Sequence, residues 1–110
     1  MSVVTVYAVF ANRDEAEAIG RATIEQRLAA CVNILAPCHS IYRWEGKVET
    51  ADEVPALFKT TYEQSSALIE AIVEDHSYDV PAIAVWPIAT LPEPYAEWVE
   101  ANTGYPLADT

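Results

Sequence analysis

The sequence predicts an α+β sandwich in the order strand, helix, strand, strand, helix, strand, followed by a short C-terminal helix. Three observations support this class. Runs of valine and aromatic residues alternate with two segments of helical periodicity, and each helical segment begins at a capping residue. A central stretch, from about Cys31 to Thr61, has strand-like residues on both sides of a single glycine. At 110 residues, we expect one domain, 1–110.

The first two elements are a buried strand and the helix that follows it. Val3 to Phe10 is dense in valine and aromatic residues, as expected for a central strand. Asn12 has the chemistry of an N-cap, and Glu15 three positions later completes a box-like pair. Apolar residues recur at helical spacing to about Arg27, where we expect the helix to end. Gly20 inside this helix predicts close packing on the sheet.

The central stretch is interpreted as a long β-hairpin. Its first arm begins with a strand at 31–35, and Pro37 must bend that strand or place it at an edge, because proline cannot donate to a ladder. The turn is predicted at 45–47, Glu-Gly-Lys, since its glycine tolerates positive φ. The second arm continues to Thr61. Such long arms project beyond a small domain, and their exposed edges predict that another subunit covers them.

The second half of the chain repeats the alternation of helix and strand. Thr61 caps a helix with Gln64 at its third position, and that helix ends near Asp75. Val80 to Ile88 is the next predicted strand, with a proline near each end. Pro94 lies in the first turn of a short C-terminal helix. The complete order is the split βαβ arrangement of ferredoxin-like sandwiches, with one helix added.

The composition limits the partners and the compartment. The 17 acidic and 6 basic residues give a net charge of −11, which repels phosphate backbones and anionic lipids, so we expect neither nucleic acid nor a membrane as partner. Cys31 and Cys38 are too few for a disulfide framework and are expected to be free thiols. No signal-peptide pattern and no run of about 20 apolar residues is present in the sequence, so the expected location is cytoplasmic.

Four blocks of residues stand out along the chain. They read Leu-Ala-Ala-Cys-Val-Asn at 28–33, Ser-Ile-Tyr-Arg-Trp-Glu-Gly-Lys at 40–47, Leu-Phe-Lys-Thr-Thr at 57–61 and His-Ser-Tyr-Asp-Val-Pro at 76–81. In sequence and in order they resemble the CutA divalent-cation tolerance protein family. The resemblance implies a ferredoxin-like, cytoplasmic homotrimer assembled through its long hairpins, similar to the PII signalling proteins. It also implies a link to tolerance of copper and other divalent ions.

This chain has only some of the metal ligands that are found in the family it resembles. Bacterial members discussed as copper binders have a cysteine on the first strand and a second histidine at the helix end, whereas this chain has Ala8 or Val9 and Asp75 at those places. His76 and Cys31 remain as the matching ligands for copper or another divalent cation. The block after the helix departs from the family's His-Pro-Tyr-Glu-x-Pro-Glu pattern at three positions, Ser77, Asp79 and Ala82.

Considered from the residues alone, metal binding is expected to be weak or moderate. A strong copper site needs three or four converging ligands, and the sequence has neither Cys-x-x-Cys nor His-x-x-x-His. Adjacent Cys38 and His39 would face opposite sides of a strand, and whether they contribute stays open. Cys31 could instead be a small buried hydrophobe, and His76 a favourable charge at a helix end. A site shared between subunits and dependent on His76 is the metal hypothesis.

A second hypothesis is a PII-like trimer that binds a small ligand, or acts as a signalling scaffold, through clefts between subunits. Trp44, Tyr78 and Trp86 would supply stacking surfaces, and Lys59 would supply a cation for an anionic ligand. The competing interpretation is that these aromatic residues pack in a core or an interface. The sequence contains no nucleophile elbow, zincin helix or phosphate-binding glycine loop, so we do not expect an enzyme.

Overall fold

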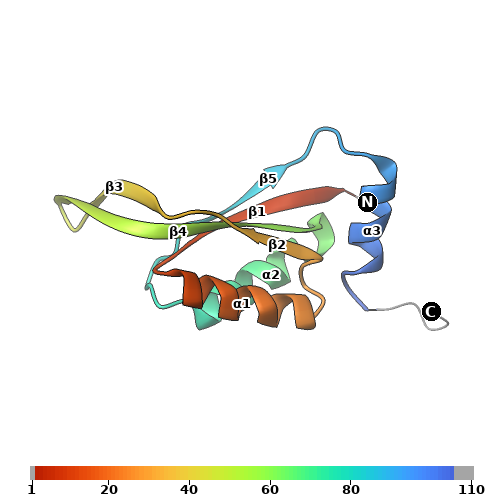
Figure 1. Ribbon diagram of the computed structural model, residues 1–110, viewed down its shortest axis with the longest axis horizontal. Coiled ribbons are helices and arrows are strands. Elements are labelled where there is room, and N and C mark those ends of the chain that lie inside the picture. Colours follow the sequence, from red (N-terminus) through yellow and green to blue (C-terminus); the bar gives the residue numbers. More distant parts are fainter. Residues whose placement is uncertain (1, 106–110) are drawn as a thin grey trace.

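The molecule is elongated because a hairpin arm extends from a two-layer body (Figure 1). The computed structural model describes residues 2–105, and its extents are 53 × 27 × 22 Å. The elements are β1 (Val3–Phe10), α1 (Arg13–Glu25), β2 (Cys31–Ile34), β3 (Cys38–Trp44), β4 (Lys47–Thr61), α2 (Tyr62–Asp75), β5 (Ile83–Pro87) and α3 (Glu93–Ala101). Among the described helices, none has the length and apolar content needed to cross a membrane.

The five strands form one antiparallel sheet with α1 and α2 on one face (Figure 1). The order is β2-β4-β1-β5, and β3 pairs with the part of β4 that lies beyond β2. Because β4 separates β1 from β2, the first βαβ unit is split. The α3 helix lies at the end of the sheet where β1 begins (Figure 1). The α+β, ferredoxin-like sandwich with a C-terminal helix is therefore confirmed.

Both predicted helix starts are confirmed, but one capping detail differs. The Asn12 side chain accepts a hydrogen bond from the Glu15 N–H at 2.9 Å, and the Thr61 hydroxyl accepts one from the Gln64 N–H at 3.3 Å. The Glu15 carboxylate does not complete a capping box. Its Oε1 instead lies 3.5 Å from the His76 Nδ1, and among the described residues this buried oxygen has no hydrogen-bond partner.

The hairpin has its turn at Glu45-Gly46, where both residues have positive φ, 49° and 81°. The first arm is broken: β2 ends at Ile34 and β3 starts at Cys38. Opposite the break lies Pro55 of β4, whose carbonyl accepts from the Leu35 N–H at 2.9 Å. In an antiparallel strand the N–H and C=O of one residue face the same neighbour, so the donor that Pro55 lacks would have faced this break. The interruption thus accommodates a proline within the longest strand.

The core lies between the sheet and the two helices. Phe10 of β1, Phe58 of β4 and Ile72 of α2 are fully buried in one cluster. Burial of side chains of this size contributes about 1.5–3 kcal/mol each. Where α1 passes over β2, a Cβ on Gly20 would lie 3.0 Å from Cγ1 of Val32. The predicted close packing of this glycine on the sheet is confirmed.

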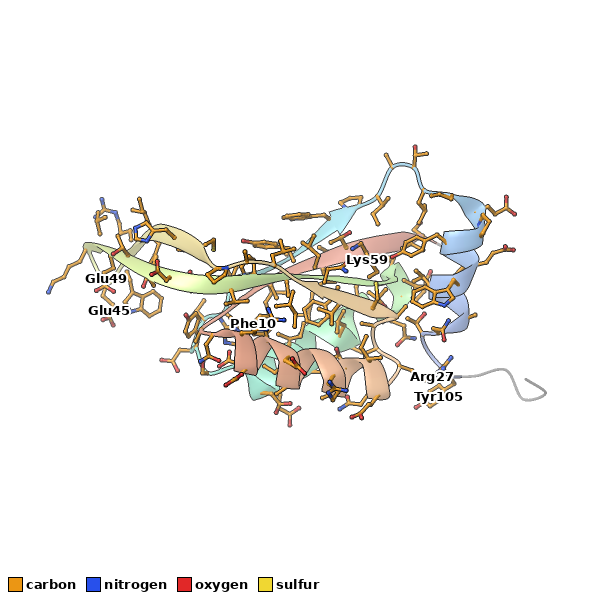
Figure 2. All side chains as sticks on the ribbon, in the orientation of Figure 1. Phe10, Arg27, Glu45, Glu49, Lys59 and Tyr105 are labelled. Atoms are coloured by element: carbon orange, nitrogen blue, oxygen red, sulfur yellow. The ribbon has the colours of Figure 1, made fainter. Side chains whose placement is uncertain are left out.

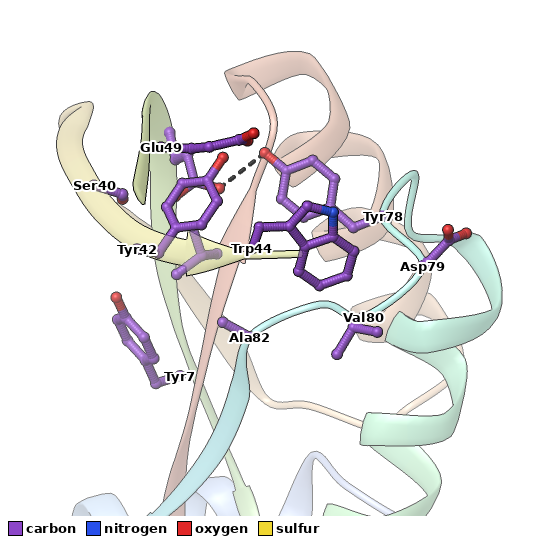
Figure 3. Close-up of a pocket in the computed structure, with 11 residues that line it drawn as sticks. Tyr7, Ser40, Tyr42, Trp44, Glu49, Tyr78, Asp79, Val80 and Ala82 are labelled. Atoms are coloured by element: carbon purple, nitrogen blue, oxygen red, sulfur yellow. Dashed lines mark hydrogen bonds between the residues drawn. The ribbon is translucent and has the colours of Figure 1, made fainter. Parts of the chain in front are cut away.

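The strand predicted at 80–88 is shorter than expected, because β5 spans only Ile83–Pro87. Residues 76–82 form a loop that begins directly after α2. Pro81 has no N–H for a ladder, and the loop meets β1 through a bond from the Val9 N–H to the Ala82 carbonyl, 3.2 Å long. This loop brings Tyr78 beside the hairpin (Figure 3).

Candidate functional site

A cavity of about 570 Å³ lies between the hairpin arm, β1 and the loop after α2 (Figure 3). Its wall is mostly aromatic and acidic. The aromatic residues are Tyr7, Tyr42, Trp44 and Tyr78, and the acidic residues are Glu49, Glu53 and Asp79. Ser40, Val9, Val80 and Ala82 complete the lining. A volume of this size lies within the range of about 300–1,000 Å³ that is typical of small-molecule sites.

Strand alternation explains why these side chains converge. On β3, Tyr42 and Trp44 are two residues apart and so face the same side of the hairpin. On β4, Glu49 and Glu53 share that side, and the register places Glu49 directly opposite Tyr42. On β1, Val6, Ala8 and Phe10 fill the core, which leaves Tyr7 and Val9 on the cavity side of the sheet.

One hydrogen bond joins the loop to the hairpin inside this cavity. The Tyr78 hydroxyl donates to the Glu53 Oε2 at 2.8 Å, drawn as the dashed line in Figure 3. Burial, together with the hydrogen bond to Glu53 and its charge, raises the pKa of Tyr78 to about 12. Burial also raises the pKa of Tyr7, and the nearby Cys38 and Glu53 add to that shift. Both phenols are therefore neutral in the physiological pH range.

His76 is buried beside this cavity and both of its ring nitrogens are engaged. Nε2 lies 2.7 Å from the Val9 carbonyl oxygen, which can only accept, so Nε2 carries the proton. Nδ1 then accepts from the Tyr78 N–H at 3.0 Å. The ring also stacks on Phe10, with centroids 5.1 Å apart. These contacts fix the loop after α2, and a metal could reach His76 only by replacing one of them.

Cys31 lies in a different part of the molecule. It pairs with Lys59 in the ladder between β2 and β4, and its Sγ is 3.6 Å from the Tyr95 hydroxyl of α3. Burial, followed by the hydrogen bond to Cys31, raises the pKa of Tyr95 to about 12. The fold does not bring Cys31 and His76 together within one chain. Within residues 2–105, no three His, Cys, Asp or Glu side chains are grouped as metal ligands would be.

The adjacent residues Cys38 and His39 face opposite sides of β3, as the pleat requires. The Cys38 Sγ lies 3.7 Å from the Ser40 Oγ, on the cavity side. The His39 Nδ1 lies 2.9 Å from Asp52 Oδ1, and both of these side chains are exposed. Cys31 and Cys38 are both free thiols, as expected.

Comparison with known proteins identifies the family. Residues 4–102 match the model of the CutA1 divalent ion tolerance protein family. The chain belongs to this family. It is 42% identical over 93 residues to the divalent-cation tolerance protein CutA of Thermus thermophilus, covering 84% of this chain and 90% of the relative. A solved Thermus thermophilus structure, described as a divalent cation tolerance protein (Cut A1), has a TM-score of 0.90 at 39% identity and covers 93% of this chain and 99% of its own.

A plant relative differs in length. The protein CutA, chloroplastic, of Arabidopsis thaliana is 34% identical over 100 residues, which are 91% of this chain but 55% of the relative. The chain thus spans about half of that protein. The name of this relative places that protein in the chloroplast.

The structure of this CutA1 family member separates the four residues proposed for a ligand cleft. Trp44 and Tyr78 both line the cavity. Trp86 of β5 stays outside but stacks on Tyr7, with ring centroids 4.8 Å apart and planes at 12°. Lys59 lies elsewhere, with its Nζ 3.4 Å from the Asn33 Oδ1. Two of the three predicted aromatic residues therefore line this cavity, whereas Trp86 and Lys59 do not.

Three important cavity residues were not among the site residues predicted from the sequence: Tyr7, Tyr42 and Glu53. The spacing of Tyr42 and Trp44 could have indicated Tyr42, because residues two apart share one face of a strand. No local signal marks Tyr7 or Glu53. Their place in the cavity depends on which strands pair and in which register.

Proposed function

We propose that this protein serves divalent-cation tolerance, with copper among the relevant ions, and that it acts as a homotrimer. Membership of the CutA1 family over residues 4–102 is the observation that supports this function most strongly. The name of the Thermus thermophilus relative states the same role for that protein. Both thiols are free, which suits a reducing compartment, so the cytoplasm remains the proposed location.

Self-association is supported by the apolar surface of the hairpin. Ile41 and Val48 have exposed fractions of 70% and 64%. The register places both on the face of the arm opposite to Tyr42 and Trp44, which face the cavity. These side chains lie on an arm that extends from the body of the molecule (Figure 1). A sheet arm with apolar side chains in water favours pairing with other copies of the chain. A trimer would bury this surface.

Direct metal binding would require ligands from more than one chain, because residues 2–105 contain no cluster of three His, Cys, Asp or Glu side chains that could hold a metal ion. His76 and Cys31 are the ligands proposed on the family resemblance. His39 is a further donor: its Nδ1 is oriented by Asp52, which directs Nε2 outward from an exposed ring. A carboxylate that orients a histidine in this way is common behind metal ligands.

Native mass spectrometry of chelator-treated protein, titrated with copper and zinc, tests assembly and metal uptake together. We expect a mass of about 36 kDa, three times the 12.1 kDa of one chain, and uptake of copper in multiples of three. Comparison of His76→Ala, Cys31→Ser and His39→Ala with the unsubstituted chain then identifies the ligands. A trimer that stays free of metal would contradict the direct metal role, and unchanged copper uptake in His76→Ala would remove His76 from it.

A second candidate function, small-ligand binding by a PII-like trimer or scaffold, is supported by the cavity that contains Trp44 and Tyr78. Thermal-shift screening of the trimer against small metabolites tests it. Stabilisation by a ligand that is lost on Trp44→Leu would support this function. The absence of any shift across charged and neutral metabolites would count against it.

A further inference from the structure

All charged side chains that line the cavity beside the hairpin are negative. Three carboxylates line it. Within residues 2–105, no lysine or arginine is part of the lining. The chain as a whole carries a net charge of −11, which raises the local concentration of cations near its surface. An anionic ligand would meet repulsion here without a compensating positive group. A cation would be attracted.

Glu53 makes this preference specific. Only 9% of the residue is exposed, and its Oε2 is held by the Tyr78 hydroxyl. A neutral apolar ligand that filled the cavity would remove the remaining water from this carboxylate and add no partner to the Tyr78 hydroxyl, which is unfavourable for a charged group. A ligand that carries a positive charge would instead pair with it in a poorly hydrated place.

The aromatic side chains make an organic cation a better fit than a bare metal ion. Four rings, from Tyr7, Tyr42, Trp44 and Tyr78, contribute to the lining, and tryptophan and tyrosine faces attract alkylated cations. The carboxylates of this wall are not grouped as a metal site would need. A volume of about 570 Å³ also exceeds the need of a single ion and suits a small molecule.

We infer that this cavity binds a small organic cation of the alkylammonium type, with the ring of Trp44 against its alkyl groups and Glu53 opposite its charge. The inference rests on the second candidate function, small-ligand binding, and is independent of metal tolerance. Tyr78 acts as the positioning residue for Glu53, because its hydroxyl holds that carboxylate at 2.8 Å. The hairpin, the loop after α2 and β1 thus all contribute side chains to the site (Figure 3).

Isothermal titration of the full chain with tetramethylammonium chloride tests this inference, with neopentyl alcohol as a neutral compound of similar shape. We expect saturable binding of the cation and none of the alcohol. Glu53→Gln keeps an acceptor for Tyr78 but removes the charge, and Trp44→Leu removes the aromatic face. Each is expected to weaken binding about tenfold or more. The matched controls Glu97→Gln and Trp98→Leu on the exposed face of α3 should bind as the unsubstituted chain does.

Three outcomes would overturn the inference. Equal binding of the neutral alcohol would show a merely apolar pocket, and unchanged binding by Glu53→Gln would remove the charge pairing. If the assembled protein ignores tetramethylammonium while a dissociated Ile41→Glu variant binds it, a cationic side chain of another copy occupies the cavity. Copper uptake of the Glu53→Gln and Trp44→Leu variants, measured separately, is expected to match that of the unsubstituted chain, so failure here is distinguishable from failure of the metal proposal. Circular dichroism of every variant confirms that a loss of binding is not a loss of fold.

Discussion

The two halves of β4 share one continuous strand but lie in opposite environments. In the outer half, 47–52, five of six residues are exposed, and the only strand beside it among residues 2–105 is β3. In the inner half, 53–61, all residues are buried or partly buried, with β1 on one side and β2 on the other. The figures show the same contrast, since the helices lie under the inner half only (Figure 1, Figure 2).

This difference separates folding from association. The inner half contributes Phe58 to the core and carries Pro55 opposite the break in the first arm. The outer half carries Val48, an apolar side chain that is 64% exposed and so contacts little of its own chain. We therefore expect substitutions in the inner half to unfold the chain, and substitutions in the outer half to change what the chain binds.

The largest expected effect is in the inner half. Phe58→Ala removes a fully buried ring from the core cluster and should lower the free energy of unfolding by about 3–5 kcal/mol. Urea denaturation followed by circular dichroism measures this change. Val73→Ala, at a half-exposed position on α2, is the control and should change stability by no more than about 0.5 kcal/mol. Equal effects of the two substitutions would contradict the assignment of the core.

The next largest effect is in the outer arm. Ile41→Glu combined with Val48→Glu places two charges on the exposed apolar arm and should weaken each contact between chains by about 2 kcal/mol or more. Sedimentation velocity should then report single chains of 12.1 kDa with native circular dichroism. Loss of the fold itself would show that the arm also stabilises the body, which would weaken the comparison between the halves.

A smaller effect is expected at the end of β4. Thr61→Ala removes the hydroxyl that accepts from the Gln64 N–H, and should lower the free energy of unfolding by about 1 kcal/mol. Ser66→Ala, exposed on the same helix, is the matched control and should have almost no effect. If Thr61→Ala lowers the free energy of unfolding by no more than Ser66→Ala does, water replaces the capping hydroxyl without cost.

The smallest effect is at the junction of the halves, where Tyr78 donates to Glu53. The folded-state pKa of Tyr78, about 12, lies above the ordinary value of 10.0, so folding favours the neutral phenol. Its contribution to stability is fully present below pH 10 and is lost as the pH rises toward 12. Unfolding measured at pH 9 and above pH 11 should show a smaller alkaline loss in Tyr78→Phe than in the unsubstituted chain. Identical losses would contradict the role of this bond.

Local patterns predicted most of the fold. The capping positions Asn12 and Thr61, the turn at residues 45–47 and the glycine that touches β2 follow from short-range chemistry, and each is confirmed. The strand at 80–88 was predicted too long because local apolarity does not reveal that the loop must turn toward His76. Short-range patterns therefore predict which helices and strands form better than they predict where a strand begins and ends.

The candidate site was predicted only in part, because it depends on contacts between distant segments. Trp44 and Tyr78 line one cavity only because the loop after α2 folds against the hairpin. No spacing of residues in the sequence predicts that contact. Lys59, predicted for a cleft between subunits, lies outside the cavity of the single chain, because the register of β4 places it beside β2 with its side chain near Asn33. The engagement of both His76 nitrogens likewise depends on Val9, which lies 67 residues away.

Hydrogen exchange along β4 tests most directly whether the outer half is completed by other copies of the chain. In the assembled protein, we expect the amides of 47–52 to be nearly as protected as those of 54–61, and to lose that protection selectively in the Ile41→Glu, Val48→Glu variant. Exchange of 47–52 within seconds in the unsubstituted protein, with 54–61 still protected, would contradict an arm buried between chains.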